Sequence, residues 1–301
     1  MKILYQAVFM SYLAIALFLG FDNSAIAVIT PSISDMFNAG IINLQEQNYD
    51  QALVNFSQAI AQPGNLTGAA YSNRCLVNLQ LQHNTAAEAD CLRAIEYNSH
   101  NLEAHLNLGL AYYRQGKYPS AIAQYQKVIQ QDTNDYRAYY NRGLVYLALN
   151  DSQSAITDYQ TALNHSTDSD TESQSLIYND LALARIMSGQ TRQAIANITQ
   201  AIALNDNNYS AYYNRGCAYH QLREYKAAIK DFSQAVQLNP NFTQAYVHRG
   251  ILNRQIGATK VADQDFNIAL KQYHDQGNRE QYDLVSNLKQ KLFYSQAHRL
   301  V

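Results

Sequence analysis

The chain has 301 residues, a formal net charge of −2 and only 15% charged residues. This near-neutral balance produces no strong field toward nucleic acid or an acidic membrane surface, so neither is expected as a partner. Four Pro and 24 Tyr, with no Trp, leave a composition compatible with helix along most of the chain.

The N-terminus has the layout of a secretory signal peptide. Lys2 precedes an almost wholly apolar run over 7–21, and a small-x-small step ends at Ala27. We therefore expect a signal peptide over 1–27 with cleavage after Ala27. The alternative is an uncleaved anchor formed by residues 3–21. Both interpretations place the folded part outside the cytoplasm, in a periplasm or a thylakoid lumen, secreted or tethered to the membrane.

A repeat with a period of 34 residues follows. The string Ala-Tyr-Tyr-Asn-Arg-Gly occurs at 138–143 and again at 211–216. Gly109 and Gly143 are 34 positions apart, and so are Gly216 and Gly250. In every unit the eighth position is small, the twentieth is Ala and the twenty-fourth is usually large. These spacings place the residues on one helical stripe, where two helices can approach closely.

This pattern resembles the tetratricopeptide-repeat (TPR) family over residues 33–276. The resemblance implies an all-α fold, a right-handed α-solenoid of seven helix-turn-helix units. The units begin near Ile33, Gly68, Leu102, Tyr136, Ser175, Tyr209 and Thr243. An insert over 164–174 is expected in the turn before Ser175. Residues 279–299 are predicted to form an amphipathic capping helix, because a solenoid end needs a polar outer face.

The family resemblance places the first helix of each unit on the inner surface of the superhelix. The sixth position of these helices is mostly Asn, and a carboxamide offers both a donor and an acceptor to the backbone of an extended peptide. The row is Asn38, Asn73, Asn107, Asn141 and Asn214. It resembles the asparagine ladder in the TPR superhelix of the enzyme that attaches N-acetylglucosamine to protein hydroxyls. The alternative is that Asn is simply a common solvent-facing residue of such units.

Aromatic and basic side chains are expected beside the Asn row. Tyr residues supply flat, amphipathic contact area of the kind that binding surfaces favour. The candidates are Tyr113, Tyr140 and Tyr213, with Arg114, Arg137 and Arg254 as the basic residues of the groove.

Several familiar sites are not predicted. TPR domains that hold acidic chaperone tails use Lys, Asn and Arg, where this chain has Phe37, Ile41, Glu103 and Asn107. No phosphate loop, nucleophile elbow or zinc-protease motif occurs. We therefore expect no enzyme, no cofactor and no metal. The acidic run from 168 to 172 lacks the Gly and the closing Glu of a calcium loop.

Two cysteines fall in one unit. Cys75 and Cys91 occupy the eighth and twenty-fourth positions, on helices that should meet at that level. An oxidising compartment would allow them to form a disulfide. The alternative is two small buried thiols that only fill space. Cys217 has no partner in register and is expected to remain free.

Arg at the seventh position and Asp at the twenty-third appear together or not at all. Because both lie at similar heights on antiparallel helices, we predict four structural ion pairs. They are Arg74 with Asp90, Arg142 with Asp158, Arg215 with Asp231, and Arg249 with Asp265. The alternative is that the residues were duplicated together and never touch.

These features predict a non-catalytic scaffold for protein–protein interaction. It would hold an extended peptide or a partner helix in its concave groove during assembly of envelope or thylakoid complexes. The Tyr-, Asn- and Gln-rich style resembles exported TPR proteins of photosynthetic bacteria. The alternative is an accessory subunit of an envelope enzyme or transporter that binds through its convex face or its cap. A membrane contact is expected only through the N-terminus or a membrane-protein partner.

Overall fold

The computed structural model describes residues 31–167 and 170–294, which form fifteen α-helices. The predicted signal peptide or anchor lies outside the described residues. In order, the helices are α2 (Ile33–Gln45), α3 (Tyr49–Ala61), α4 (Thr67–Gln80), α5 (Asn84–Tyr97), α6 (Leu102–Arg114), α7 (Tyr118–Gln131), α8 (Tyr136–Ala148), α9 (Ser152–His165), α10 (Thr171–Met187), α11 (Thr191–Leu204), α12 (Tyr209–Gln221), α13 (Tyr225–Leu238), α14 (Thr243–Gln255), α15 (Thr259–Asp275) and α16 (Arg279–Tyr294). None of these described helices has the length and apolar character that crossing a membrane requires.

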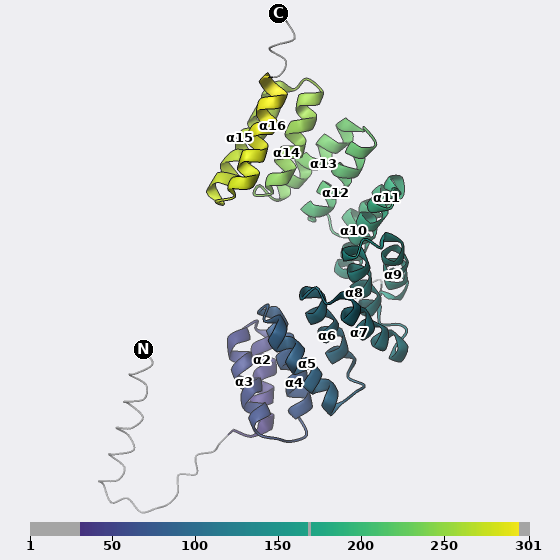
Figure 1. Cartoon of the computed structure of the whole chain (residues 1–301), viewed down its shortest axis with the longest axis vertical. Helices are drawn as coiled ribbons and strands as arrows, with labels where there is room; N and C mark the ends of the chain where they lie inside the picture. The colour runs from purple at the N-terminus through teal and green to yellow at the C-terminus, as the bar shows by residue number, and fades with distance from the viewer. Residues whose placement is uncertain (1–30, 168–169, 295–301) are drawn as a thin grey trace, which may run out of the picture.

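Consecutive helices pack as pairs, and the pairs stack into an arc (Figure 1). Seven pairs run from α2/α3 to α14/α15, and α16 packs on α15 at the end. The first helices also pack on one another along the stack from α2 to α12. In the middle of the arc they lie on its inner side, with the second helices outside. The predicted all-α solenoid of helix pairs is therefore confirmed.

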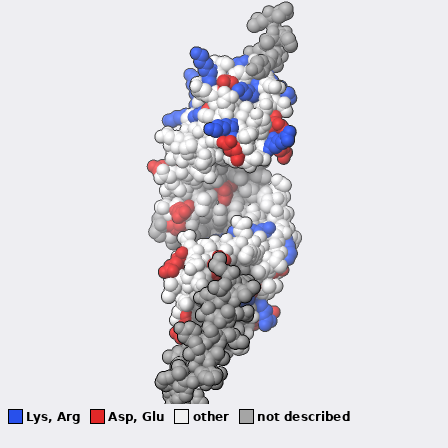
Figure 2. Space-filling view, turned by 90° about the vertical axis from the view of Figure 1, so that its left-hand side faces the viewer, with Lys and Arg blue, Asp and Glu red and all other residues white. Residues whose placement is uncertain are grey.

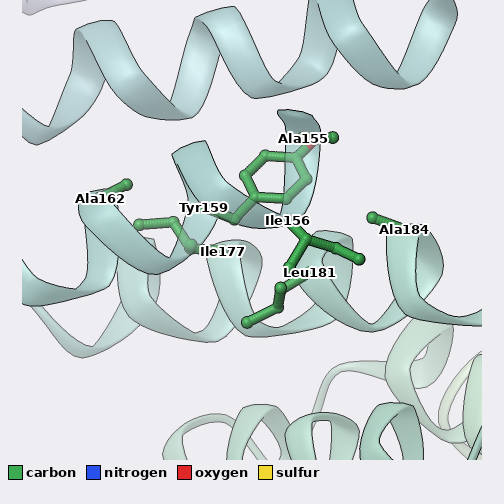
Figure 3. Close-up of a cluster of buried hydrophobic side chains, with 7 residues drawn as sticks. All are labelled: Ala155, Ile156, Tyr159, Ala162, Ile177, Leu181 and Ala184. Atoms are coloured by element: carbon green, nitrogen blue, oxygen red, sulfur yellow. The ribbon is translucent and has the colours of Figure 1, made fainter. Parts of the chain in front are cut away.

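Small residues on the first helix make room for a large residue on the second. A Cβ atom added at Gly143 would lie 2.7 Å from a ring carbon of Tyr159, too close for any real contact. Tyr159 is fully buried and packs with residues of the next first helix, α10 (Figure 3). The cluster comprises Ala155, Ile156, Tyr159, Ala162, Ile177, Leu181 and Ala184. The large residue thus packs its own helix pair against the following pair, which is how a solenoid builds a continuous core.

The turn inside each pair contains one residue with positive φ. In four pairs this residue is not glycine: Gln47, Gln82, Asn150 and Arg223 have φ between 59° and 61°. Gly116, Gly189 and Gly257 hold the same place in the other pairs. The left-handed conformation costs a side-chain-bearing residue roughly 1 kcal/mol or more. The packed helices on both sides therefore determine this turn more strongly than its own sequence does.

Two boundaries differ from the sequence prediction. The insert over 164–174 is mostly helical, because α9 extends to His165 and α10 begins at Thr171. Asp170 caps α10 by accepting a hydrogen bond from the Ser173 amide at 3.1 Å, so the helix begins before the expected unit start. The capping helix α16 is described as far as Tyr294. Its predicted continuation to 299 lies outside the described residues.

Candidate binding groove

The inner face of the arc is hollowed and carries few charges. Figure 2 views this face and shows mostly uncharged side chains, with acidic groups in and beside the hollow. Lys and Arg are more frequent toward the C-terminal end. The first helices α6, α8, α10 and α12 follow one another along the hollow. Exposed side chains on these helices open onto the groove, because their other sides are covered by neighbouring helices.

The Asn row is not uniform. Asn73 donates to the carbonyl of Ala69 at 2.9 Å, one turn earlier in its own helix, and Asn38 lies 3.5 Å from the Ser34 hydroxyl. Asn214 donates to the Asn179 side chain of the neighbouring helix at 2.9 Å.

The middle of the row differs from its ends. Within the described part of the chain, the carboxamides of Asn107 and Asn141 have no hydrogen-bond partner, and both are partly exposed. The two residues lie on adjacent first helices, α6 and α8. Two donors and acceptors are therefore available at the centre of the groove.

Asp180 is a groove residue that the sequence analysis did not select. It occupies the place of the Asn row on α10, and its carboxylate accepts a hydrogen bond from the Tyr140 hydroxyl at 2.8 Å. Asn179 also donates to it at 3.3 Å. Burial raises the pKa of Asp180, and these two hydrogen bonds only partly oppose that shift. The only signal in the sequence was an acid standing where other units have Asn or His.

The predicted aromatic residues differ in their roles. The Tyr140 ring packs against Tyr159 with centroids 5.9 Å apart, while its hydroxyl reaches across to Asp180. The Tyr113 ring lies 6.1 Å from Tyr118 and remains partly exposed. Tyr213 instead packs into an aromatic cluster, with centroid distances of 4.8 Å to Phe242, 5.4 Å to His248 and 5.6 Å to Phe232. Tyr113 and Tyr140 are thus the aromatic residues near the free carboxamides.

The predicted basic residues are engaged within the chain. The Arg114 side chain donates to the Leu79 carbonyl at 2.6 Å, at the C-terminal end of α4. Arg137 contacts Asp135 at 2.8 Å and Glu103 at 2.7 Å. The contacts with Leu79 and Glu103 join neighbouring first helices.

Arg254 is also engaged within the chain, at the C-terminal end. Its Nε donates to the Leu292 carbonyl of α16 at 3.0 Å, and its guanidinium lies over the Phe293 ring. Their contacts therefore assign all three basic candidates of the groove a structural role.

All four Arg–Asp pairs lie within hydrogen-bonding distance, each Arg engaging both carboxylate oxygens. The shortest separations are 2.6 Å for Arg74–Asp90, 2.8 Å for Arg142–Asp158, 2.7 Å for Arg215–Asp231 and 2.6 Å for Arg249–Asp265. The Asp side chains are 2–7% exposed and the Arg side chains 17–22%. Each pair joins the two helices of its own unit and is largely removed from solvent.

Three of these Arg residues also reach the preceding unit. Arg74, Arg215 and Arg249 each face a hydroxyl on the preceding second helix. The three hydroxyl partners are Ser57 at 3.0 Å, Thr199 at 3.3 Å and Ser233 at 3.2 Å. Each of the four guanidiniums also lies over a Tyr ring of its own helix at 5.4–5.7 Å. The guanidinium groups of all four Arg residues are therefore engaged in contacts within the chain.

The cysteines occupy two different environments. Cys75 and Cys91 form a disulfide between α4 and α5, with Cα atoms 5.4 Å apart and both residues fully buried. Cys217 is free, and its sulfur lies 3.6 Å from Nδ1 of His248. Burial raises the pKa of Cys217 to about 11 and lowers that of His248. Both groups are neutral at physiological pH, so they do not form a thiolate–imidazolium pair. Among the described residues, no cluster of His, Cys, Asp or Glu could hold a metal.

Family models match two segments of the chain. Models of the tetratricopeptide repeat match residues 137–169 and 209–242, and a TPR repeat model matches 110–150. The chain is a TPR protein. Repeats of this kind are generally non-catalytic scaffolds that bind proteins or peptides.

Solved structures resemble the TPR protein over most of their own lengths. The crystal structure of MamA is 26% identical over 57% of this chain and 97% of its own, with a TM-score of 0.52. A tetratricopeptide-repeat protein from Parabacteroides merdae is 18% identical and covers 85% of this chain and all of its own, with a TM-score of 0.65. YrrB, described as a TPR protein with an unusual peptide-binding site, is 19% identical over 66% of this chain and 97% of its own, with a TM-score of 0.52. The last two show likeness of fold alone.

The positions that would form a basic clamp for acidic tails are otherwise occupied in this TPR protein. Phe37 packs on the buried ring of Phe56 at 5.8 Å, and Ile41 joins the same core cluster. Glu103 pairs with Arg137. The groove therefore presents free carboxamides, phenols and one acid in this region.

Proposed function

We propose that this TPR protein is a non-catalytic scaffold that holds an extended peptide or a partner helix in its concave groove. The observation that carries the proposal is the pair of unengaged carboxamides, Asn107 and Asn141, on adjacent first helices. A carboxamide can donate to a peptide carbonyl and accept from a peptide amide at once. Tyr113 and Tyr140 lie on the same two helices and would add contact area at low entropic cost.

The proposed site of action is outside the cytoplasm, in the assembly of envelope or thylakoid protein complexes. The signal-like residues 1–27 support export, and residues 3–21 would tether an uncleaved form. The Cys75–Cys91 disulfide supports an oxidising compartment, since disulfides persist there and are rare in the cytosol. N-terminal sequencing of the native protein tests this proposal. A mature chain beginning at residue 28 would agree with it, and a cytosolic chain beginning at Met1 would contradict it.

Site-specific photocrosslinking tests the groove. A photoreactive amino acid is placed at Asn107 or Asn141, and in a control at Lys127, an exposed position on the second helix α7. The proposal expects adducts from the groove positions, and expects competition by the peptide that mass spectrometry finds at the crosslink. Adducts from Lys127 or from the α16 end alone would instead favour an accessory subunit that binds through the convex face or the cap.

A further inference from the structure

We propose that Asp180 receives a cationic side chain, Lys or Arg, of the segment bound in the groove, with apolar residues on either side of it. This inference rests on the proposed groove function and specifies the chemistry of the partner. Three independent features of the described residues support it: the unpaired carboxylate, an unpartnered buried phenol beside it, and an apolar stripe on the same helix.

The Asp180 carboxylate has no cationic partner. Its only contacts are hydrogen bonds from Tyr140 and Asn179, both neutral, and it takes part in none of the ion pairs of the described chain. The other mostly buried Asp residues, such as Asp158, are held by an Arg. A largely buried carboxylate without a counter-charge is unfavourable, so a protein keeps one mainly where something outside the fold compensates it.

A second polar group near Asp180 is also unsatisfied. The Tyr159 side chain is fully buried, and its hydroxyl has no hydrogen-bond partner. The ring is held between the Gly143 backbone and the Tyr140 ring, and the phenol lies close enough to Asp180 for the charge to act on it. The corresponding position in three other units is Phe, so packing alone does not require this hydroxyl. Guanidinium and ammonium groups carry several donors and could serve the Asp180 carboxylate, whereas the enclosed phenol could be reached only after a shift of the side chains around it.

An apolar stripe flanks Asp180 on α10. Leu176, Leu183 and Met187 are 47%, 39% and 45% exposed. Their spacings of seven and four residues place them on the same helix face as Asp180, the face that opens onto the groove. Large apolar side chains exposed in a row mark an interaction surface more often than a solvated one.

The combination selects the class of ligand. An acidic segment would be repelled by Asp180, and Arg114 and Arg137, which could have attracted it, are already engaged. A neutral segment would cover the carboxylate and leave its charge without compensation. A Lys or Arg with apolar neighbours satisfies the acid and the stripe.

A peptide library in which the central residue is fixed tests the inference. The probes are acetylated and amidated nonapeptides with one fixed central residue and mixed flanking positions. The fixed residue is Arg, Lys, citrulline or Glu in separate pools. Retention on the immobilised protein is compared for the wild type, for Asp180→Asn, for the Asn107→Ala/Asn141→Ala double variant, and for Asp206→Asn. The last variant removes the same charge at an exposed site. Circular dichroism verifies that each variant is folded.

The expected result is retention of the Arg and Lys pools about tenfold above the citrulline pool, as for a close charge pair. Asp180→Asn should remove this preference, whereas Asp206→Asn should keep it. Equal retention of the Arg and citrulline pools by the wild type would overturn the inference, as would a preference that survives in Asp180→Asn. In either case, if all pools bind the wild type and lose binding in the Asn107→Ala/Asn141→Ala variant, the proposed groove function still holds although the Asp180 inference fails. Failure of every pool to bind the wild type would reject both.

Discussion

Removing one partner of an Arg–Asp pair should destabilise the solenoid severely. In Asp158→Ala the Arg142 guanidinium loses two hydrogen bonds of 2.8 Å, while its side chain remains only 17% exposed. Stranding a buried charge in this way costs about 3–5 kcal/mol. Because the residual exposure of Arg142 lets water reach part of the guanidinium, we expect the free energy of unfolding to fall by about 3 kcal/mol, the lower end of this range. Asp263→Ala is the matched control, because Asp263 is 45% exposed and its pair with Lys289 should contribute ~1 kcal/mol or less.

Urea unfolding followed by circular dichroism measures both losses, with the slope of the transition compared among variants because a repeat array need not unfold in two states. A second variant, Arg142→Met with Asp158→Leu, removes both charges and should recover most of the lost free energy. A loss below ~1 kcal/mol for Asp158→Ala would refute the reasoning, since that is the value of an exposed pair. So would a double variant no more stable than Asp158→Ala.

Three further outcomes are expected. Gly143→Ala should lose about 1–3 kcal/mol of unfolding free energy in urea, because the new Cβ would lie 2.7 Å from an aromatic ring carbon; Gly250→Ala, with its nearest neighbours at 3.3 Å, should lose less. Replacing Cys75 and Cys91 together by Ala should lower the free energy of unfolding by ~3 kcal/mol under oxidising conditions. Adding reductant should make the wild type nearly as unstable as this variant. A variant with the same thermal midpoint as the oxidised wild type would contradict the prediction. Asp180→Asn should raise the thermal midpoint at neutral pH. Burial raises the pKa of this carboxyl in the folded state. The folded wild type is therefore most stable at low pH, where Asp180 is protonated, and loses stability as pH rises through the folded-state pKa and the carboxyl ionises. The gain should shrink toward about pH 4, and a gain independent of pH would contradict the assignment.

The repeat made the fold readable from the sequence. The period of 34 residues repeats the same contact in each unit, in which a small residue such as Gly143 on the first helix faces a large residue such as Tyr159 on the second. The early start of α10 was not readable in the same way. It depends on one cap, the Asp170 carboxylate on the Ser173 amide, inside a segment where the repeat pattern is interrupted.

The groove was less predictable than the fold. The joint occurrence of Arg142 and Asp158 located a contact within one unit, because the geometry of one unit is fixed by the repeat. Contacts between units depend on how far one pair is rotated on the next, which no single-unit pattern encodes. For this reason the partners of Arg114 and Arg137, and the reach of Tyr140 to Asp180, came only from the structure.

The guanidinium bridges from a first helix to a hydroxyl on the preceding second helix are distributed unevenly along the stack. They occur at the boundary crossed by Arg74 and at those crossed by Arg215 and Arg249, near the two ends of the array. The three central boundaries of the described chain are linked through their first helices instead, by Arg114 with Leu79, Arg137 with Glu103, and Tyr140 with Asp180. A repeat array unfolds according to the strength of each nearest-neighbour interface, so polar links at every boundary from α3/α4 to α13/α14 favour unfolding in large units rather than one pair at a time. The central links join the helices that carry Asn107, Asn141 and Asp180, so contacts between the units fix the spacing of these groove side chains before any segment binds.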